Sequence, residues 1–227
     1  MYKTILFDLD DTIFDFKKSE RCALIKTFCQ LGIEPSDDIL SRYSVINQQQ
    51  WKRLELGEIS REQVKVGRYK LLFDEYGIDE PPEKTTAIYE NNLAEGHYFI
   101  DGAVEMLEEL YKNFSLYLVS NGAKKVQDGR LADSGISHFF KNIFISEVIG
   151  FEKPSKDFFD YCFNKIPNVD KSCTIIIGDS LSSDIKGGKN AGISTMWFNP
   201  HHQVNDTDII PDYEISSLSE IKAFLNG

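Results

Sequence analysis

The sequence predicts an α/β protein in which a Rossmann-like parallel sheet carries an all-helical cap domain inserted after the first strand. Three observations support this fold class. A short apolar run at residues 4–9 ends in acidic residues, and residues 16–98 then contain helical patterns and no convincing strand. From about residue 99 onward, short apolar runs alternate with helical stretches. Such alternation is typical of parallel strands joined by helical crossovers.

The predicted domains follow from this change of pattern. We expect residues 1–15 and 99–227 to form the α/β core domain, and residues 16–98 to form the helical cap domain. A chain of 227 residues is long enough for one large hydrophobic core and a smaller second one.

Strands are expected where apolar runs are short and rich in β-branched residues. The predicted strands are residues 4–9, 116–119, 143–145, 174–177, 194–198 and 213–215. The run at 174–177 is the most apolar of the six, as expected for a central strand that is buried on both faces.

Helices are expected where apolar residues recur every three or four positions between capping residues and glycines. The predicted helices are residues 19–31, 36–54, 60–76, 84–95, 101–112, 124–134, 155–165, 183–192 and a last one from 217. Predicted caps are Ser36, Asp101 and the capping boxes of Ser60 with Gln63 and of Ser217 with Glu220. Cys22 and Cys29 share a face of the first helix, where we expect both to be small buried apolar residues.

Composition excludes several classes of partner. The net charge is −11, and a field of that sign repels the phosphate backbone of a nucleic-acid polymer. A small anionic substrate would therefore need a metal ion or a lysine at its site. No run approaches the ~18 apolar residues of a membrane span, and no basic, apolar leader precedes the first strand. We expect a cytoplasmic protein that does not bind membranes.

The first strand ends in two acidic residues that are expected to face the same way. Side chains alternate along a strand, so Asp8 and Asp10 would project from the same side. Carboxylates about 4 Å apart repel by roughly 4 kcal/mol at an effective dielectric constant near 20, unless a cation lies between them or one is protonated. Ligands bind at the carboxyl ends of strands in open α/β sheets. The alternative is an acidic turn in which Asp10, Asp11 and Thr12 are turn and cap residues.

Three later strands also lead into polar residues. Ser120, Asn121 and Gly122 follow the second strand and offer a hydroxyl, an amide and accessible backbone N–H groups, although this triplet is also an ordinary turn. After the third strand comes Lys153, and after the fourth come the acids of residues 179 and 184. Together they indicate one site at the edge of the sheet.

These residue types suit phosphoryl transfer. The carboxylates of Asp8 and Asp179 and the backbone carbonyl near Asp10 are hard oxygen ligands of the kind that Mg²⁺ prefers. Lys153 would help to offset the acids, so that a dianionic phosphoryl group can approach. One aspartate can attack phosphorus while a second donates a proton to the leaving alkoxide.

The four motifs resemble those of the haloacid dehalogenase superfamily of phosphatases. They are D-x-D-x-T at residues 8–12, Ser120, Lys153, and G-D-x-x-x-x-D at residues 178–184. The resemblance implies Mg²⁺, with Mn²⁺ as a substitute, and an aspartyl-phosphate intermediate. The implied roles are Asp8 as nucleophile and Asp10 as general acid and base, with Ser120, Asn121 and Lys153 as phosphate ligands. The implied metal ligands are Asp8, Asp10 and Asp179, and Asp184 would support either the metal or Lys153. Dehalogenases do not need Asp10, so its presence favours phosphate chemistry.

A closer resemblance is to bacterial nucleotidases that cleave nucleoside 5′-monophosphates, including noncanonical pyrimidine ones. It rests on residues 45–51, 57–60, 67–69 and 187–202. It implies a 5′-nucleotidase whose partner is a small phosphorylated metabolite, and we expect a monomer or weak homodimer. Candidate contacts to the base in the cap are Asn47, Trp51, Arg68 and Tyr69, with core packing or a surface ion pair as the alternatives. His201 and His202 are expected in a polar loop rather than at a metal.

Other functions remain open on the sequence alone. A sugar-phosphate phosphatase or a phosphomutase could share the catalytic core and differ only in the cap. A phosphonate hydrolase would need a Schiff-base lysine from the cap. A catalytically silent binding module could also keep the fold, although four intact motifs argue against it.

Overall fold

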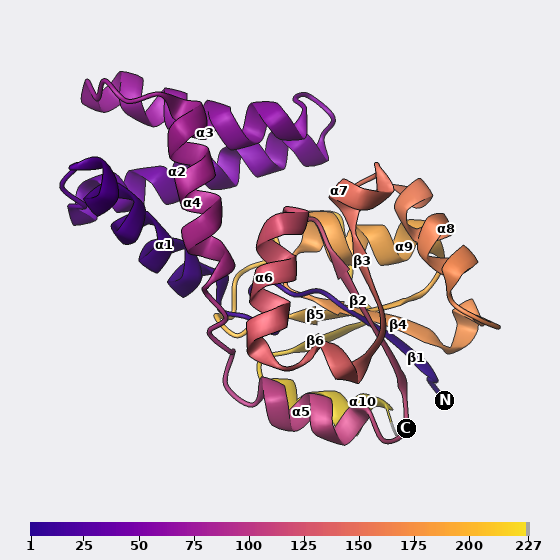
Figure 1. Cartoon of the computed structure of the whole chain (residues 1–227). Coiled ribbons are helices and arrows are strands. Elements are labelled where there is room, and N and C mark those ends of the chain that lie inside the picture. The colour runs from indigo at the N-terminus through magenta and orange to yellow at the C-terminus, as the bar shows by residue number, and fades with distance from the viewer. Residues whose placement is uncertain (226–227) are drawn as a thin grey trace.

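The computed structural model describes residues 1–225, and its centre is a six-stranded sheet in the order β3-β2-β1-β4-β5-β6 (Figure 1). The strands are β1 (Thr4–Phe7), β2 (Ser115–Ser120), β3 (Phe140–Ile145), β4 (Thr174–Gly178), β5 (Ser194–Phe198) and β6 (Tyr213–Ile215). Every neighbouring pair is parallel. The predicted α/β class, with helices inserted after the first strand, is confirmed.

The helices inserted after β1 gather to one side of the sheet (Figure 1). They are α1 (Phe16–Leu31), α2 (Asp37–Glu55), α3 (Arg61–Tyr76) and α4 (Pro82–Ala94). Their buried side chains, among them Phe28, Tyr43 and Leu72, form a hydrophobic cluster separate from the two that flank the sheet. On this basis we propose that residues 16–98 are a domain of their own, which is called the cap below.

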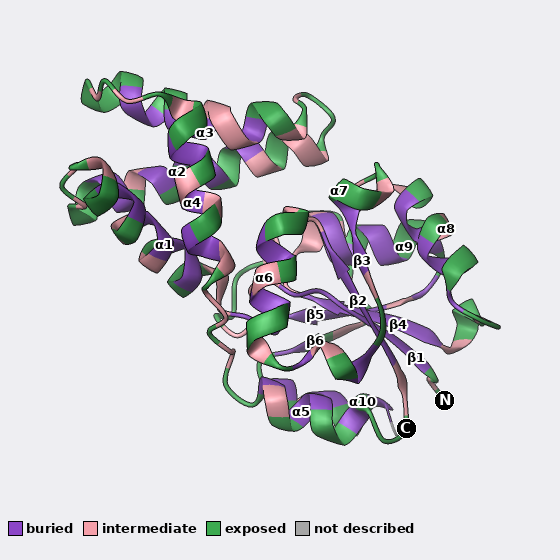
Figure 2. Cartoon of the chain, in the orientation of Figure 1, coloured by how far each residue is buried: buried purple, intermediate pink, exposed green. Residues whose placement is uncertain are grey.

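Helices cover both faces of the sheet because the strands bury both sets of their alternating side chains. The helices of this part are α5 (Ala103–Leu110), α6 (Lys124–Ser134), α7 (Ser146–Ile149), α8 (Lys156–Lys165), α9 (Lys186–Ala191) and α10 (Ile221–Leu225). Ile5 and Ile175 pack in the cluster that includes α5 and α10, whereas Leu6 and Ile176 pack in the one that includes α8. Figure 2 shows the strands buried between these layers.

Most predicted elements are present, and the differences have local causes. Ser36 caps α2, and both predicted capping boxes form. Asp101 was expected to cap α5 and does not, because the N-cap is Gly102 in a left-handed conformation (φ 78°). The helix expected at 183–192 begins as a π-helical turn at Leu181–Ile185 and continues as α9. The short helix α7 was not expected, since four residues carry no periodic pattern.

The strand order brings the ends of β1 and β4 together at the centre of the sheet. The strand order reverses direction at this point. Strands β2 and β3 lie on one side of β1, whereas β4, β5 and β6 lie on its other side. The β1–β4 pairing aligns Phe7 with Ile177, and the Asp8 amide donates to the Ile177 carbonyl over 2.9 Å. In open α/β sheets such a reversal leaves a crevice outside the carboxyl ends of the strands. None of the helices within residues 1–225 is long and apolar enough to cross a membrane.

The cysteines differ in exposure, and the expectation for Cys22 and Cys29 is wrong. Cys29 is exposed and Cys22 is half-buried, whereas Cys162 is completely buried and burial raises its pKa to about 12. Since the thiolate is the reactive form, we expect Cys29 to react with a disulfide reagent at pH 8 and Cys162 to stay unreactive until the protein unfolds. Mass mapping of labelled peptides with and without denaturant measures this. Labelling of Cys162 in the folded protein would contradict the described packing.

Candidate functional site

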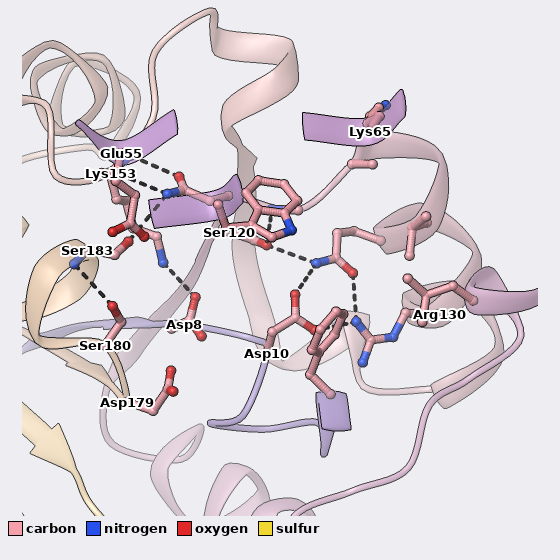
Figure 3. Close-up of a pocket in the computed structure, with 18 of the residues that line it drawn as sticks. Asp8, Asp10, Glu55, Lys65, Ser120, Arg130, Lys153, Asp179, Ser180 and Ser183 are labelled. Carbon is pink, nitrogen blue, oxygen red and sulfur yellow. Dashed lines mark hydrogen bonds and ion pairs between the residues drawn. The ribbon is translucent and has the colours of Figure 1, made fainter. Parts of the chain in front are cut away.

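Three carboxylates meet where β1 and β4 end. Asp8 follows β1, Asp179 follows β4, and Asp184 lies in the π-helical turn that comes next. One carboxylate oxygen from each lies within 4.8 Å of the others. Asp8 and Asp184 are only 6% and 1% exposed, so this negative charge is largely removed from water. Figure 3 shows Asp8 and Asp179 projecting toward the same space.

The pKa values reflect this crowding. Burial, followed by repulsion from Asp184 and Asp10, raises the pKa of Asp8 to about 8 although Lys153 opposes the shift. Burial also raises the pKa of Asp179 well above its usual value, and repulsion from Asp8 and Asp184 adds to the shift. Buried carboxylates at such short separation favour a bound cation or a proton.

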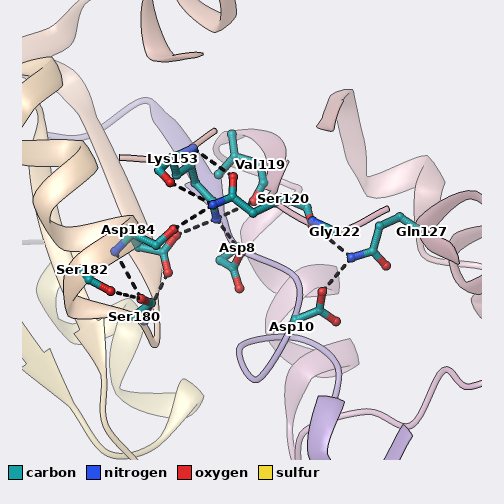
Figure 4. Close-up of polar contacts among 12 residues, drawn as sticks. Asp8, Asp10, Val119, Ser120, Gly122, Gln127, Lys153, Ser180, Ser182 and Asp184 are labelled. Carbon is teal, nitrogen blue, oxygen red and sulfur yellow. Dashed lines mark hydrogen bonds and ion pairs between the residues drawn. The ribbon is translucent and has the colours of Figure 1, made fainter. Parts of the chain in front are cut away.

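Lys153 lies between two of the acids. Its Nζ donates to Asp8 Oδ1 and Asp184 Oδ1, both at 2.6 Å, and to the Val119 carbonyl at 3.0 Å (Figure 4). Burial lowers the pKa of this lysine, but attraction to Asp184 and Asp8 outweighs that effect and the net shift is upward. An ammonium has three N–H donors, so all three are used by protein groups. Lys153 therefore fixes the orientation of Asp8 and offsets part of the acidic charge.

The residues at the end of β2 and directly after it face the same crevice. Ser120 is 1% exposed, and its Oγ accepts hydrogen bonds from the Gly122 amide and from Gln127 Nε2, both at 3.0 Å. The Asn121 side chain exchanges two 2.9 Å hydrogen bonds with the backbone of Lys153. Asn121 thus connects the end of β2 to the chain segment that contains Lys153.

Asp10 lies apart from the three-carboxylate group. Its Oδ2 accepts from Gln127 Nε2 at 2.6 Å, and its Oδ1 pairs with the Arg130 guanidinium (Figure 3). The third side chain near a metal would therefore be Asp184, expected above only as a support, while Asp10 could contribute its backbone carbonyl. Gln127 and Arg130 were not singled out from the sequence. The signal in the sequence was that these two polar residues stand next to the apolar Val126 and Leu131. In the structure all four lie on the buried face of α6.

A cavity extends from these acids toward the cap. Its core wall includes Asp8, Asp10, Ser120 and Lys153, and its cap wall includes Trp51, Arg68 and Tyr89. Two of the four cap residues expected to meet a substrate, Trp51 and Arg68, therefore do line it.

The other two, Asn47 and Tyr69, do not line the cavity but are buried behind Arg68. Arg68 Nη1 donates to Asn47 Oδ1 at 3.0 Å, and Asn47 in turn donates to the buried Glu20 at 2.6 Å. The Tyr69 ring lies 5.3 Å from the Arg68 guanidinium. Their contacts hold Arg68 in place, which the sequence spacing did not reveal.

The cap is joined to the core by polar contacts at the rim of the cavity. Arg61 Nη1 donates to the Asn121 carbonyl at 2.8 Å, and Arg61 Nη2 donates to Ser146 Oγ at 2.6 Å. Ser182 Oγ donates to Glu55 at 2.7 Å. These contacts were not predicted, because they depend on how the cap sits over the sheet. His201 and His202 are exposed in the chain between β5 and β6, and neither belongs to the group of three carboxylates.

Known proteins resemble this chain in sequence and in fold. Residues 5–198 match the sequence pattern of haloacid dehalogenase-like hydrolases. The chain is 44% identical to the HAD-hydrolase YfnB of Bacillus subtilis, over 99% of this chain and 96% of that protein. The crystal structure of YfnB bound to magnesium, which reveals interdomain movement, superposes with a TM-score of 0.96 and covers 100% of this chain and 99% of YfnB.

Two further relatives are described as pyrimidine 5′-nucleotidases. PynA of Streptococcus pneumoniae is 37% identical, over 97% of this chain and 93% of its own length. YjjG of Escherichia coli is 31% identical, over 97% of this chain and 96% of its own length. The matched pattern covers most of the chain and includes all four motifs, so this protein belongs to the haloacid dehalogenase-like hydrolases.

Proposed function

We propose that the protein is a Mg²⁺-dependent phosphatase that hydrolyses small phosphomonoesters, in particular nucleoside 5′-monophosphates. The observation that carries the proposal is the convergence of Asp8, Asp179 and Asp184 within 4.8 Å beside the buried Lys153. Hydrolysis of a phosphate ester needs mainly positioning and charge stabilisation, which this arrangement offers.

The donor set fits magnesium. Carboxylate oxygens are hard ligands that Mg²⁺ accepts in octahedral geometry together with waters. One buried ammonium faces three carboxylates, so the group has room for a further positive charge. We assign the metal to Asp8, Asp179 and the Asp10 carbonyl, with Asp184 beside them, and Mn²⁺ could take its place. When bound, the ion would offset the charge of the phosphoryl oxygens.

The residues of the chain then have distinct tasks. Asp8, held by Lys153, attacks phosphorus and forms an aspartyl-phosphate as the ester P–O bond breaks. Asp10 gives its proton to the departing alkoxide and later takes one from the water that hydrolyses the intermediate. The Ser120 hydroxyl and the backbone N–H groups beside it would bind the phosphoryl oxygens, and Lys153 would add its charge.

The preference for nucleotides rests on the cap wall and on the relatives. The curated names of PynA and YjjG describe pyrimidine 5′-nucleotidases. Trp51 and Tyr89 bring aromatic rings to the cavity, and stacking of a base on an aromatic side chain contributes about 1–3 kcal/mol. Arg68, held from behind by Asn47, would present N–H donors to the base or ribose.

A panel of phosphorylated metabolites tests the proposal. Pyrimidine and purine nucleoside 5′-monophosphates and sugar phosphates are incubated with the protein and Mg²⁺, and inorganic phosphate is measured. We expect release of phosphate, with the highest kcat/KM for a nucleoside monophosphate. Higher kcat/KM on sugar phosphates would reject the nucleotidase assignment. An isomerised phosphate would identify a mutase, and no turnover of any compound would reject the enzyme.

Metal dependence gives a separate prediction. Chelator-treated protein should release no phosphate, and Mg²⁺ should restore activity and raise the free energy of unfolding, by about 2.7 kcal/mol when its concentration is 100 times its Kd. Asp179→Asn should lose most of this stabilisation, because it removes one of the converging carboxylates. The matched control is Asp157→Asn, which alters an exposed acid of α8. Full activity in excess chelator would be incompatible with the proposed site.

A further inference from the structure

We propose that Arg130 and Gln127 are positioning residues for Asp10, and that Arg130 links the position of this acid to the two chain segments that connect the cap to the core. The inference rests on the proposed function, since it assumes that Asp10 protonates the leaving group. It concerns two residues of α6, neither of which belongs to the four motifs at residues 8–12, 120, 153 and 178–184.

Gln127 connects Asp10 to the phosphoryl-binding end of β2. Its Nε2 donates to Asp10 Oδ2 at 2.6 Å and to Ser120 Oγ at 3.0 Å (Figure 4). A proton donor must lie within hydrogen-bond reach of the leaving oxygen, which is itself bonded to the phosphoryl group near Ser120. One amide therefore fixes the separation that proton transfer requires.

The Gln127 amide packs directly against the backbone of Gly122, where a larger residue would not fit. A Cβ on Gly122 would lie 2.1 Å from Gln127 Nε2 and 2.7 Å from its Cδ. The Gln127 side chain is only 1% exposed and is held by its hydrogen bonds to Asp10 and Ser120, which a Cβ at residue 122 would displace. The glycine at 122 thus makes space for the Gln127 amide between Ser120 and Asp10.

Arg130 holds Asp10 from the opposite side. It is completely buried, its Nη1 pairs with Asp10 Oδ1, and the same nitrogen donates to Gln127 Oε1 at 3.1 Å. A buried guanidinium carries a large desolvation cost, which is offset here by a carboxylate and several oxygen acceptors. The Arg130 ion pair fixes Asp10 Oδ1, and the Gln127 amide fixes Asp10 Oδ2.

The remaining donors of Arg130 reach the connections between cap and core. Nε donates to the Gly96 carbonyl at 2.6 Å, in the segment that returns from α4, and Nη2 donates to Ser19 Oγ at 3.5 Å, in the first turn of α1. The Ser19 hydroxyl donates to the Asp15 carbonyl at 2.8 Å, and the Gly96 carbonyl lies 3.3 Å from the same oxygen. A shift of either segment, at Ser19 or at Gly96, would therefore act on Asp10 through the buried Arg130 side chain.

The test compares two leaving groups in order to separate a loss of acid positioning from general damage to the site. A nitrophenolate departs without a proton, whereas the alkoxide of a nucleotide needs one. The variants Arg130→Lys, Arg130→Met and Gln127→Met are compared with the wild type on p-nitrophenyl phosphate and on uridine 5′-monophosphate, with Mg²⁺ present. The readout is the ratio of kcat/KM for the nucleotide to kcat/KM for the aryl ester, since kcat/KM covers the steps up to departure of the leaving group.

We expect this ratio to fall about 10- to 100-fold in Arg130→Met and Gln127→Met and less in Arg130→Lys, because general acid catalysis contributes typically 10²–10⁴-fold. Asp10→Asn is the reference and should lower the ratio most. Asp133→Asn, an exposed acid on the same helix, is the matched control and should leave it unchanged. Should Arg130→Met fail to fold, Arg130→Lys and Gln127→Met carry the same test.

Two failures can be told apart. A wild type that releases phosphate from neither compound rejects the proposed function. A wild type and Asp10→Asn that behave as expected, with the Arg130 and Gln127 variants slowed equally on both substrates or on neither, reject the inference alone.

Discussion

Asp8→Asn is expected to abolish phosphate release, with a loss of at least about 10⁴-fold in kcat, as for other enzymes that lose their nucleophile. The amide cannot form the aspartyl-phosphate, and it leaves Lys153 paired with Asp184 alone. Steady-state phosphate release measures the loss. Binding of an aspartyl-phosphate mimic, followed by thermal shift, should disappear with it.

The fold of this variant should stay intact. Because burial raises the pKa of Asp8 to about 8, the folded protein disfavours its ionised form, and removal of the carboxylate should not lower the unfolding midpoint in the absence of metal. Asp10→Asn is the comparison, since it keeps the nucleophile and should still release nitrophenolate from p-nitrophenyl phosphate. Normal turnover by Asp8→Asn would exclude the proposed nucleophile.

Lys153→Met is expected to affect stability as well as activity. Its ammonium pairs with Asp8 and Asp184 at 2.6 Å while 2% of its side chain is exposed, so its loss leaves buried carboxylates without a partner. Removal of one member of a buried ion pair typically lowers the free energy of unfolding by about 3–5 kcal/mol. Chemical denaturation without metal measures this change, and phosphate release should fall at least about 10²-fold.

The control for this variant is Lys156→Met, three residues along the chain. Lys156 is exposed and pairs with Asp160 at the surface, so its loss should change the free energy of unfolding by less than about 1 kcal/mol. Added Mg²⁺ should restore part of the stability of Lys153→Met, because a metal ion replaces some of the missing positive charge. Equal stability of the two variants would contradict the central place of Lys153 among the acids.

Many helices and strands could be predicted from the sequence, because periodicity and capping residues are local features of the chain. Periodicity and caps predicted α6 at residues 124–134 and β5 at 194–198 with the bounds that the structure has. The end of β1 and the start of β3 were less well predicted, since pairing with neighbouring strands decides where a strand begins and stops. The cap at Asp101 is missing for a local reason, because Gly102 in a left-handed conformation (φ 78°) takes the N-cap position of α5.

The site divides in the same way. Sequence alone was enough to predict that Asp8, Ser120, Lys153 and Asp179 lie together, because parallel strands carry whatever follows them to one edge of the sheet. Only the tertiary structure decided the partners of these residues. It turned Asp10 toward Gln127 and Arg130, and it gathered Asp184 with the carboxylates of Asp8 and Asp179. It also placed Asn47 and Tyr69 behind Arg68 instead of in the cavity. Such contacts join elements far apart in the chain, and no spacing within a single element encodes which side chains will meet.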